Sequence, residues 1–235
     1  MSKILVESLV EKLVAEDKNI LILDTCCVLD VIRCIQRENL SVLKTTVEII
    51  NVFDEKQNKF QIVLPSLIDT EWSDNYASVR GETKSYIEKC DIAHKNLIES
   101  CKIVFPTALE SMSFSHYNLE SILSDFSEKL LYLSLRLESI EECKLNAFNR
   151  VVQHIPPAAQ GKDSTKDCVI FEETLCISKL LRDNGFTKKI VFATSNTREY
   201  FRNHNTIPEI ANELKKSNIE IVTSLSHGYY LSQKD

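Results

Sequence analysis

The sequence predicts an α/β fold with a doubly wound, mostly parallel sheet, helices on both faces of the sheet and a helical insertion. Two observations predict this class. Short unbroken aliphatic runs, such as Ile20–Leu23, are typical of strands buried on both faces in the centre of a parallel sheet. Between these runs, apolar residues recur at helical spacing, and strands that alternate with helices form doubly wound sheets.

Apolar spacing and turn residues set the expected elements. Pro65 ends one strand and is preset for the early turn of a helix, Gly81 interrupts the next helical pattern, and Asn184 with Gly185 forms a left-handed cap. We predict strands at 20–23, 60–64, 189–193 and 220–223, an extended piece at 102–105 and a loop at 154–162. We predict helices over 3–16, from about 26 to 36, and over 41–56, 66–81, 82–100 and 164–184, with a further helix after Asn196.

The segment from about 110 to 152 is expected to be a helical insertion in a single domain that spans residues 1–235. From Ile122 to Ile140, apolar residues follow each other by three or four positions, which predicts a helix or helical pair with one apolar face. Two interpretations stay open: a cap packed on the main body, or a surface for a partner or a second copy of the chain.

The composition is that of an ordinary globular protein, with 43% hydrophobic and 26% charged residues. Only 4 glycines occur, and neither glycine-rich phosphate-binding motif is present, which disfavours a nucleotide-binding domain. No apolar run approaches the ~18 residues that span a bilayer, and charged residues interrupt the amino-terminal apolar pattern, so we expect no signal peptide. We therefore predict a cytoplasmic protein whose 8 cysteines are reduced thiols.

Acidic and amide side chains recur where strands end and helices begin. They are Asp24 after the first strand, Glu71 after the second, Asp163 and Asp167 near the start of a long helix, and Asn196 and Glu199 after the strand at 189–193. Ligands of doubly wound sheets bind beyond the carboxyl ends of the strands, so these side chains are expected to meet in one cleft. Crowded carboxylates favour a cation, and oxygen ligands without His or Cys select Mg²⁺ or Mn²⁺.

A structural explanation competes at each of these positions. Asp24 or Thr25 could cap the helix that follows, and Glu71 could be an exposed helix residue. The pairs Ser164 with Asp167 and Asn196 with Glu199 have the spacing of capping boxes. Convergence of several of these side chains would favour the metal-site interpretation over the capping one.

Four segments in this order resemble the motifs of the PIN domain family, metal-dependent ribonucleases related to flap-type 5′ nucleases: ILILDTCCVLD, VLPSLIDTEW, GKDSTKDCVIFEETL and VFATSNTREYF. The resemblance covers about residues 18–222 and leaves the helical insertion outside the common core. It implies that Asp24, Glu71 and Asp167 bind the metal. The fourth acid of many members is replaced here by Ser195 and Asn196, so Asn196 would be a neutral ligand or hold a water.

Nearby acids are candidates to compensate for this replacement. Asp163 would be an additional metal ligand, and Glu172 and Glu199 would support the ligands from outside. Thr25 or Ser195 would orient the attacking water and contact the substrate. The cations near these acids would bind phosphates, unless they are merely solvated surface residues: Lys162, Lys166, Arg198 and Arg202.

The resemblance thus implies an endoribonuclease that hydrolyses phosphodiester bonds in RNA with Mg²⁺ or Mn²⁺. The net charge of −6 disfavours binding of RNA by bulk electrostatics but allows a local basic groove around an acidic centre. A silent relative that binds RNA or a protein is one alternative, favoured by Asn196, and a structure-selective DNA nuclease is another. Many stand-alone bacterial members are toxins, so an antitoxin or a homodimer contact at the insertion is expected, and no membrane partner.

Overall fold

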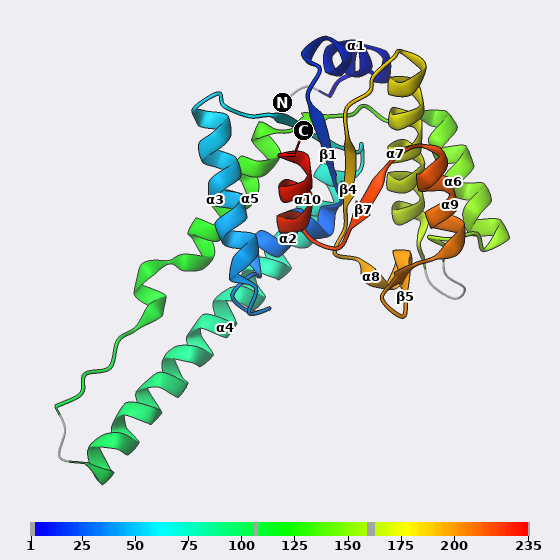
Figure 1. Ribbon diagram of the computed structural model, residues 1–235. Helices are drawn as coiled ribbons and strands as arrows, with labels where there is room; N and C mark the ends of the chain where they lie inside the picture. The colour runs from blue at the N-terminus through cyan, green and yellow to red at the C-terminus, as the bar shows by residue number, and fades with distance from the viewer. Residues whose placement is uncertain (1–2, 106–107, 159–162, 235) are drawn as a thin grey trace.

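A five-stranded parallel sheet forms the centre of the molecule (Figure 1). The structure is a computed structural model that describes residues 3–105, 108–158 and 163–234. The sheet consists of β1 (Asn19–Leu23), β2 (Phe60–Leu64), β3 (Leu135–Arg136), β4 (Ile190–Ala193) and β7 (Glu220–Val222), in the spatial order β3-β2-β1-β4-β7. Two further strands, β5 (Phe201–Arg202) and β6 (Asn205–Thr206), form a separate antiparallel pair.

The order of the strands reverses between β1 and β4. The chain adds β2 and β3 on one side of β1, and then β4 and β7 on the other side. Ligands of doubly wound sheets bind at such a reversal, in the crevice beyond the carboxyl ends of the strands. The register pairs Leu23 with Ala193, so Asp24 and Thr194 leave the sheet at the same edge.

Burial of the central strands on both faces explains their unbroken aliphatic runs. All five residues of β1 and all four of β4 are buried. Burial of one aliphatic side chain contributes about 1.5–3 kcal/mol to folding, so the central strands are strongly held in place. The predicted strands at 20–23, 60–64, 189–193 and 220–223 are confirmed, and so is the α/β class.

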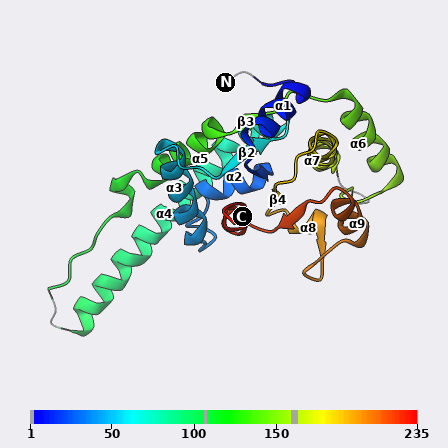
Figure 2. The ribbon, with the colours of Figure 1, turned by 45° about the horizontal axis from the view of Figure 1, so that its top comes forward.

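Helices cover both faces of the sheet (Figures 1 and 2). They are α1 (Val6–Glu16), α2 (Thr25–Ile32), α3 (Leu40–Asp54), α4 (Ile68–Val104), α5 (Leu119–Leu133), α6 (Glu141–Gln153), α7 (Thr165–Asp183), α8 (Thr197–Tyr200), α9 (Pro208–Lys216) and α10 (Leu225–Ser232), with the 3₁₀ turn η1 (Phe114–Tyr117). Helices α2, α3, α5 and α10 pack together on one face, and α1 and α6 pack on α7 on the other. Gly228 lets α10 approach β1 closely, because a Cβ there would lie 2.8 Å from Leu21 Cδ1.

Helix α4 differs from the prediction. It is one continuous helix from Ile68 to Val104, so the expected break at Gly81 and the expected extended piece at 102–105 are both wrong. A glycine inside an exposed helix costs only about 1 kcal/mol, which the rest of a long helix can tolerate. The KIVF sequence has strand-forming residues, but Ile103 and Val104 are exposed and no strand lies beside them among the described residues.

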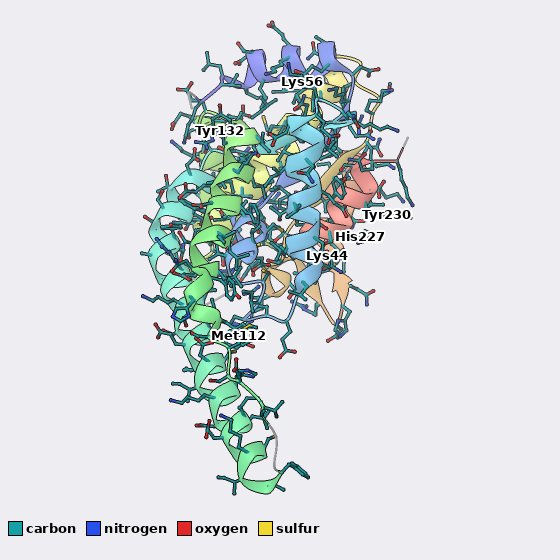
Figure 3. The ribbon with its side chains drawn as sticks, turned by 90° about the vertical axis from the view of Figure 1, so that its left-hand side faces the viewer. Lys44, Lys56, Met112, Tyr132, His227 and Tyr230 are labelled. Carbon is teal, nitrogen blue, oxygen red and sulfur yellow. The ribbon has the colours of Figure 1, made fainter. Side chains whose placement is uncertain are left out.

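The carboxyl-terminal part of α4 projects from the body as an arm in all three views (Figures 1, 2 and 3). Ile87 is the last buried residue of the helix. The returning chain is fastened to the helix at Asp91, whose carboxylate accepts hydrogen bonds from the backbone N–H of Phe114 and Ser115 and from the hydroxyls of Ser113 and Ser115. The pKa of Asp91 is held well below its usual value by these donors, the Ser115 hydroxyl first.

The segment at 110–152 packs on the main body and contributes to its hydrophobic core, as in the first of the two interpretations that the sequence left open. It supplies the edge strand β3, which separates α5 from α6. Leu123, Leu130 and Leu137 belong to the main hydrophobic core. The sequence pattern identified the helices but could not show a strand of two residues. The assignment of the whole chain to one domain with an insertion stays a prediction.

The remaining expectations concern ends and loops. Helix α2 ends at Ile32, earlier than expected, and the helix after Asn196 is the short α8, followed by the β5–β6 hairpin. Part of the expected loop at 154–162, including Lys162, lies outside the described residues. All eight cysteines are free thiols, as predicted. None of the helices in the described ranges combines the length and the apolar character needed to cross a membrane.

Candidate functional site

A pocket of ≈ 520 Å³ opens at the carboxyl ends of β1 and β4, at the reversal of strand order. Its lining includes the three acids that the sequence singled out, Asp24, Glu71 and Asp167, together with Asn196. They come from the end of β1, the start of α4, the start of α7 and the segment after β4. Positions far apart in the sequence therefore converge as predicted.

Asp24 is buried, and its side chain faces two donors. Thr194 Oγ1 donates to Asp24 Oδ2 at 2.5 Å, and Cys26 Sγ donates to the same oxygen at 3.1 Å. The two donors are in turn fixed by the segment after β4: Asn196 N–H donates to Thr194 Oγ1 at 3.1 Å, and Ser195 N–H donates to Cys26 Sγ at 3.0 Å. Backbone donors from the β4 side are thus linked to Asp24 through one hydroxyl and one thiol.

The capping explanation fails for Asp24. It occupies the N-cap position of α2, but its side chain makes no capping hydrogen bond. The same holds for Ser164 at α7 and for Asn196 at α8, where no side-chain cap bond forms. Asp24 and Asn196 therefore do not cap these helices, and Ser164 Oγ donates to Glu199 Oε2 at 3.5 Å.

Glu71 and Asp167 are each held by one neighbour. Thr25 Oγ1 donates to Glu71 Oε2 across the pocket, and Asn196 Nδ2 donates to Asp167 Oδ1 at 2.9 Å. The buried Tyr200 donates its hydroxyl to the backbone carbonyl of Asp167 at 3.2 Å, which fixes the first turn of α7. The predicted roles of Thr25 and Asn196 near the acids thus have a geometric basis.

Each of the three acids uses only one of its two oxygens in these contacts. The bonded atoms are Asp24 Oδ2, Glu71 Oε2 and Asp167 Oδ1. Within the described part of the chain, no hydrogen bond reaches the other oxygen of any of the three. The second oxygens of Asp24 and Asp167 therefore remain available to a ligand, and among the described residues Glu71 Oε1 is contacted only by the exposed Lys166, whose Nζ lies 4.0 Å away.

The acids disfavour each other's ionisation. Burial raises the pKa of Asp24 well above its usual value, and the nearby Cys26 and Glu71 add to this effect. Burial also raises the pKa of Asp167 to about 7, with further contributions from the charges of Asp24, Glu199 and Glu71, while the Asn196 hydrogen bond opposes the rise. A cation in the pocket would remove this cost, because it would stabilise the ionised form of each acid.

The donor set fits a hard divalent cation such as Mg²⁺ or Mn²⁺. The available ligand atoms are carboxylate and amide oxygens, and no histidine lines the pocket among the described residues. The present arrangement is not a closed metal cage: in the described ranges, no three His, Cys, Asp or Glu side chains are already placed to hold a metal ion. The chemistry of the residues therefore suits such an ion, and small side-chain rotations would be needed to complete its coordination.

Cationic side chains lie on the rim of the same pocket. Arg33, Arg37 and Arg198 all line it. Arg33 Nε and Arg37 Nη1 both donate to Asp30 Oδ1, at 2.9 and 2.7 Å, so their guanidinium groups are held in place. Arginine groups beside an acidic centre are suited to binding phosphate oxygens.

Comparison with family models adds an independent finding. The model of the PIN domain matches residues 21–200, which is more than half of the chain. The chain belongs to the PIN domain family. The match covers β1 from Leu21 onward, the strands β2 and β4 and every pocket residue described above, and the resemblance stated from the sequence is confirmed. Comparisons with curated proteins and with solved structures find no match.

Several residues predicted for the site of this PIN domain lie elsewhere. Asp163 is exposed and accepts a hydrogen bond from Thr165 N–H at the start of α7, outside the pocket lining. Glu172 is paired with Arg150. Lys166 lies 3.3 Å from Asp74 and 4.0 Å from Glu71, so it reaches only the edge.

Two further expectations have mixed outcomes. Arg202 lies on the β5–β6 hairpin and does not line the pocket, whereas Arg198 does. Glu199 is buried and close enough to Asp167 to raise its pKa, which agrees with a supporting position. Helix α7 turns Glu172 away because it is five residues after Asp167, and residues four apart share a helix face.

Sequence reasoning did not select Thr194 and Cys26, which hold Asp24. Thr194 follows β4 at the same edge as Asp24, so its position after a buried strand was the available signal. Cys26 had no such signal, because a free cysteine is more often a small core residue. Only the register of β1 with β4 brings Cys26 to Ser195.

Proposed function

We propose that this PIN domain is an endoribonuclease that hydrolyses phosphodiester bonds in RNA, with Mg²⁺ or Mn²⁺ bound by Asp24, Glu71 and Asp167. The family consists generally of nucleases. The observation that carries the proposal is the convergence of three carboxylates at the reversal of strand order, with one oxygen of Asp24 and one of Asp167 free of hydrogen bonds within the described residues. RNA is the substrate class that the motif resemblance implies, and DNA is an outcome of the test below.

The residues of the chain have distinct parts in this reaction. Asp24, Glu71 and Asp167 bind the cation, which would lower the pKa of a bound water and offset charge on the phosphate oxygens. Ser195 Oγ is buried without a hydrogen-bond partner among the described residues, so it can hold and orient a water. Arg198 on the rim would bind the scissile or adjacent phosphate.

The experiment is cleavage of labelled single-stranded RNA by the purified protein in Mn²⁺, in Mg²⁺ and in EDTA. We expect metal-dependent cleavage that Asp24→Asn and Asp167→Asn each lower by about 100-fold or more, a loss typical of removing one transition-state contact. Asp163→Asn is the matched control, since it makes the same change four residues from Asp167 on an exposed side chain outside the pocket. Cleavage in EDTA, or an equal loss in the Asp163 variant, would overturn the proposal, and cleavage of DNA alone would redirect it.

A second candidate is a catalytically silent module that binds RNA. Asn196 favours it, because its amide donates to Asp167 where many family members place a fourth acid. Asn196→Asp discriminates between the two: an active enzyme limited by metal binding should gain activity. The silent module should show no cleavage in either form while it still retains RNA. The expected antitoxin or second copy at residues 110–152 stays a prediction.

A further inference from the structure

The amino-terminal edge of the sheet collects lysines. Lys18 directly precedes β1, Lys59 precedes β2 and Lys189 precedes β4. The parallel register pairs Asn19 with Phe60, which places Lys18 level with Lys59, and it pairs Ile20 with Ile190 on the other side. Neighbouring strands lie about 4.8 Å apart, so the backbones of the three lysines lie side by side at the start of three adjacent strands.

These lysines line a pocket of ≈ 460 Å³, at the edge opposite the acids. Its charged side chains are mostly positive: Lys18, Lys59, Arg182, Lys188 and Lys189, against Asp17 and Glu220. The only ion pair among them, in the part of the chain that the structure describes, joins Lys188 Nζ to Asp17 Oδ2 at 3.4 Å, and both of these side chains are exposed. None of the three strand-leading lysines forms an ion pair with an acid in the described ranges, and Lys189 Nζ donates only to the carbonyl of Leu231, at 3.5 Å.

The walls of this pocket are fixed by hydrogen bonds. Arg182 donates to the carbonyls of Phe186 and Lys188, both at 2.8 Å, and to that of Asn218 at 3.1 Å. Asn19 Oδ1 accepts from the backbone N–H of Lys189 at 3.0 Å. The loops that present the cations are thus ordered before any ligand arrives.

One buried donor in the pocket wall has no partner. Arg182 Nε is shielded from solvent and makes no hydrogen bond within the described residues. Because this atom is shielded from solvent, a ligand in the pocket would reach it only after the Arg182 side chain moves. An anion in the pocket would supply acceptor atoms to this cationic wall.

The arrangement favours an anion over simple solvation of the lysines. Like charges at adjacent strand positions destabilise a sheet, and this row occurs in a chain whose net charge is −6, so it does not reflect a general excess of cations. Several ammonium groups around a concave site are suited to a phosphate, whose multiple charges and acceptor atoms they can share. The volume lies within the ~300–1,000 Å³ range of small-molecule sites.

We infer that the amino-edge pocket binds a phosphate-bearing ligand through Lys18, Lys59 and Lys189. Two sources share this chemistry: a free nucleotide, and the terminal phosphate of an RNA strand. Five-residue strands separate the two edges by about 17 Å, so the pocket is distinct from the acidic site and does not depend on the proposed nuclease activity.

Calorimetric titration of the full chain with inorganic pyrophosphate in EDTA and low salt tests this inference. EDTA removes divalent ions, so only the rim arginines of the acidic pocket could still attract phosphate, and the lysine variants below leave these arginines unchanged. We expect binding that weakens with added salt and that becomes about tenfold weaker or more in the Lys18→Gln, Lys59→Gln double variant. Lys59→Gln alone, on an exposed side chain, should weaken binding in the same direction.

The matched control is the Lys44→Gln, Lys84→Gln double variant, which removes the same charge from exposed positions on α3 and α4; Figure 3 shows Lys44 on the α3 side of the molecule. Binding in the control should equal that of the parent protein. No binding of pyrophosphate at millimolar concentration, or an equal loss in both double variants, would overturn the inference. Asp24→Asn should bind pyrophosphate normally, so failure of the nuclease proposal would leave this result intact.

Two further titrations identify the source. Tighter binding of ATP than of pyrophosphate, lost in the Lys18, Lys59 double variant, supports a free nucleotide. A preference for 5′-phosphorylated over 5′-hydroxyl RNA, lost in the same variant, supports an RNA terminus. Absence of both effects limits the site to the inorganic anion and would overturn the assignment to either ligand.

Discussion

The two edges of the sheet carry opposite charges and differ in how deeply the charged side chains are buried. At the carboxyl edge Asp24 is buried and Asp167 is partly buried, and hydrogen bonds from Thr194, Cys26 and Asn196 hold them. At the amino edge the lysine row starts on the same strands, but Lys59 is exposed. Parallel strands thus bring like charges together at both ends, and at the carboxyl edge burial, with the neighbouring charges, raises the pKa values of Asp24 and Asp167.

This difference separates the effect of strand register from the effect of burial. Register alone gathers residues that follow or precede each strand, whatever their chemistry. Burial then decides whether the gathered charges interact strongly, because water and salt screen exposed pairs much more than buried ones. The carboxyl edge should therefore respond to single substitutions and to pH, and the amino edge mainly to ionic strength.

The largest expected effect is at Thr194. Thr194→Val keeps the shape of a fully buried side chain but leaves Asp24 Oδ2 without its 2.5 Å donor and Asn196 N–H without an acceptor. The free energy of unfolding should fall by about 1–3 kcal/mol, and RNA cleavage by about tenfold or more. Thr46→Val is the control, because its buried hydroxyl donates only to Val42 of its own helix. Equal effects of the two variants on cleavage would contradict the role of Thr194.

The next effect is a pH dependence at the buried edge. The pKa of Asp167 is raised from 3.8 to about 7, so the folded metal-free protein holds a proton that the unfolded chain releases in this window. Stability contributed by this group is present at low pH and is lost as pH rises toward 7. Asp167→Asn should therefore become more stable relative to the parent between pH 4 and pH 8, by on the order of 2 kcal/mol.

Chemical denaturation in EDTA at several pH values measures this difference. Asp163→Asn should not reproduce the gain, because the pKa of Asp163 is lowered, chiefly by its hydrogen bonds with Thr165. A constant difference between Asp167→Asn and the parent across this pH range would show that Asp167 titrates normally. Mn²⁺ should restore stability to the parent at high pH and much less to the variant.

A smaller effect is expected at Cys26. Cys26→Ala removes the acceptor of Ser195 N–H and one donor to Asp24, at a cost of about 1 kcal/mol and a severalfold loss of cleavage. Cys26→Ser keeps both functions and should restore most of the activity. Cys34→Ala is the control, since Cys34 is even more buried than Cys26 but does not line the site. If serine behaves like alanine, the hydrogen-bonding role of the thiol is wrong.

The smallest effect belongs to the exposed edge. Without a ligand, the Lys18→Gln, Lys59→Gln variant should be more stable than the parent by a few tenths of a kcal/mol at low salt, because it relieves repulsion between adjacent strands. At 1 M salt, where screening acts within about 3 Å, this gain should vanish. Thermal unfolding at the two salt concentrations measures it, and a gain that survives high salt would show that the lysines are not repelling each other.

The carboxyl edge could be predicted from the sequence because its two signals are local. The aliphatic run Ile20–Leu23 predicts a buried strand, and Asp24 follows this run directly in the sequence. The same logic placed Glu71, Asp167 and Asn196 in one pocket. What could not be predicted depends on pairing: the bond from Ser195 N–H to Cys26 needs the register of β1 with β4, and no residue pattern within either segment encodes it.

The wrong predictions about the fold have a related cause. A break at Gly81 was expected because glycine weakens helices. In the structure α4 continues through Gly81, which lies in open space, since a Cβ there would contact nothing within 4 Å. The strand β3 has only two residues and is defined by its pairing with Val63 and Leu64. Asp163 was expected beside Asp167, but the local bond to Thr165 N–H keeps it outside.

The arm formed by α4 affects how the molecule moves through water. Beyond Ile87 the helix continues to Val104, a length of about 25 Å at the usual rise per residue. Its distal side chains Leu97 and Ile103 are exposed, so the arm stands in solvent and adds drag without adding much mass. The protein should sediment more slowly than a compact chain of 235 residues, and its frictional ratio would report the outward position of the arm without any change to the sheet.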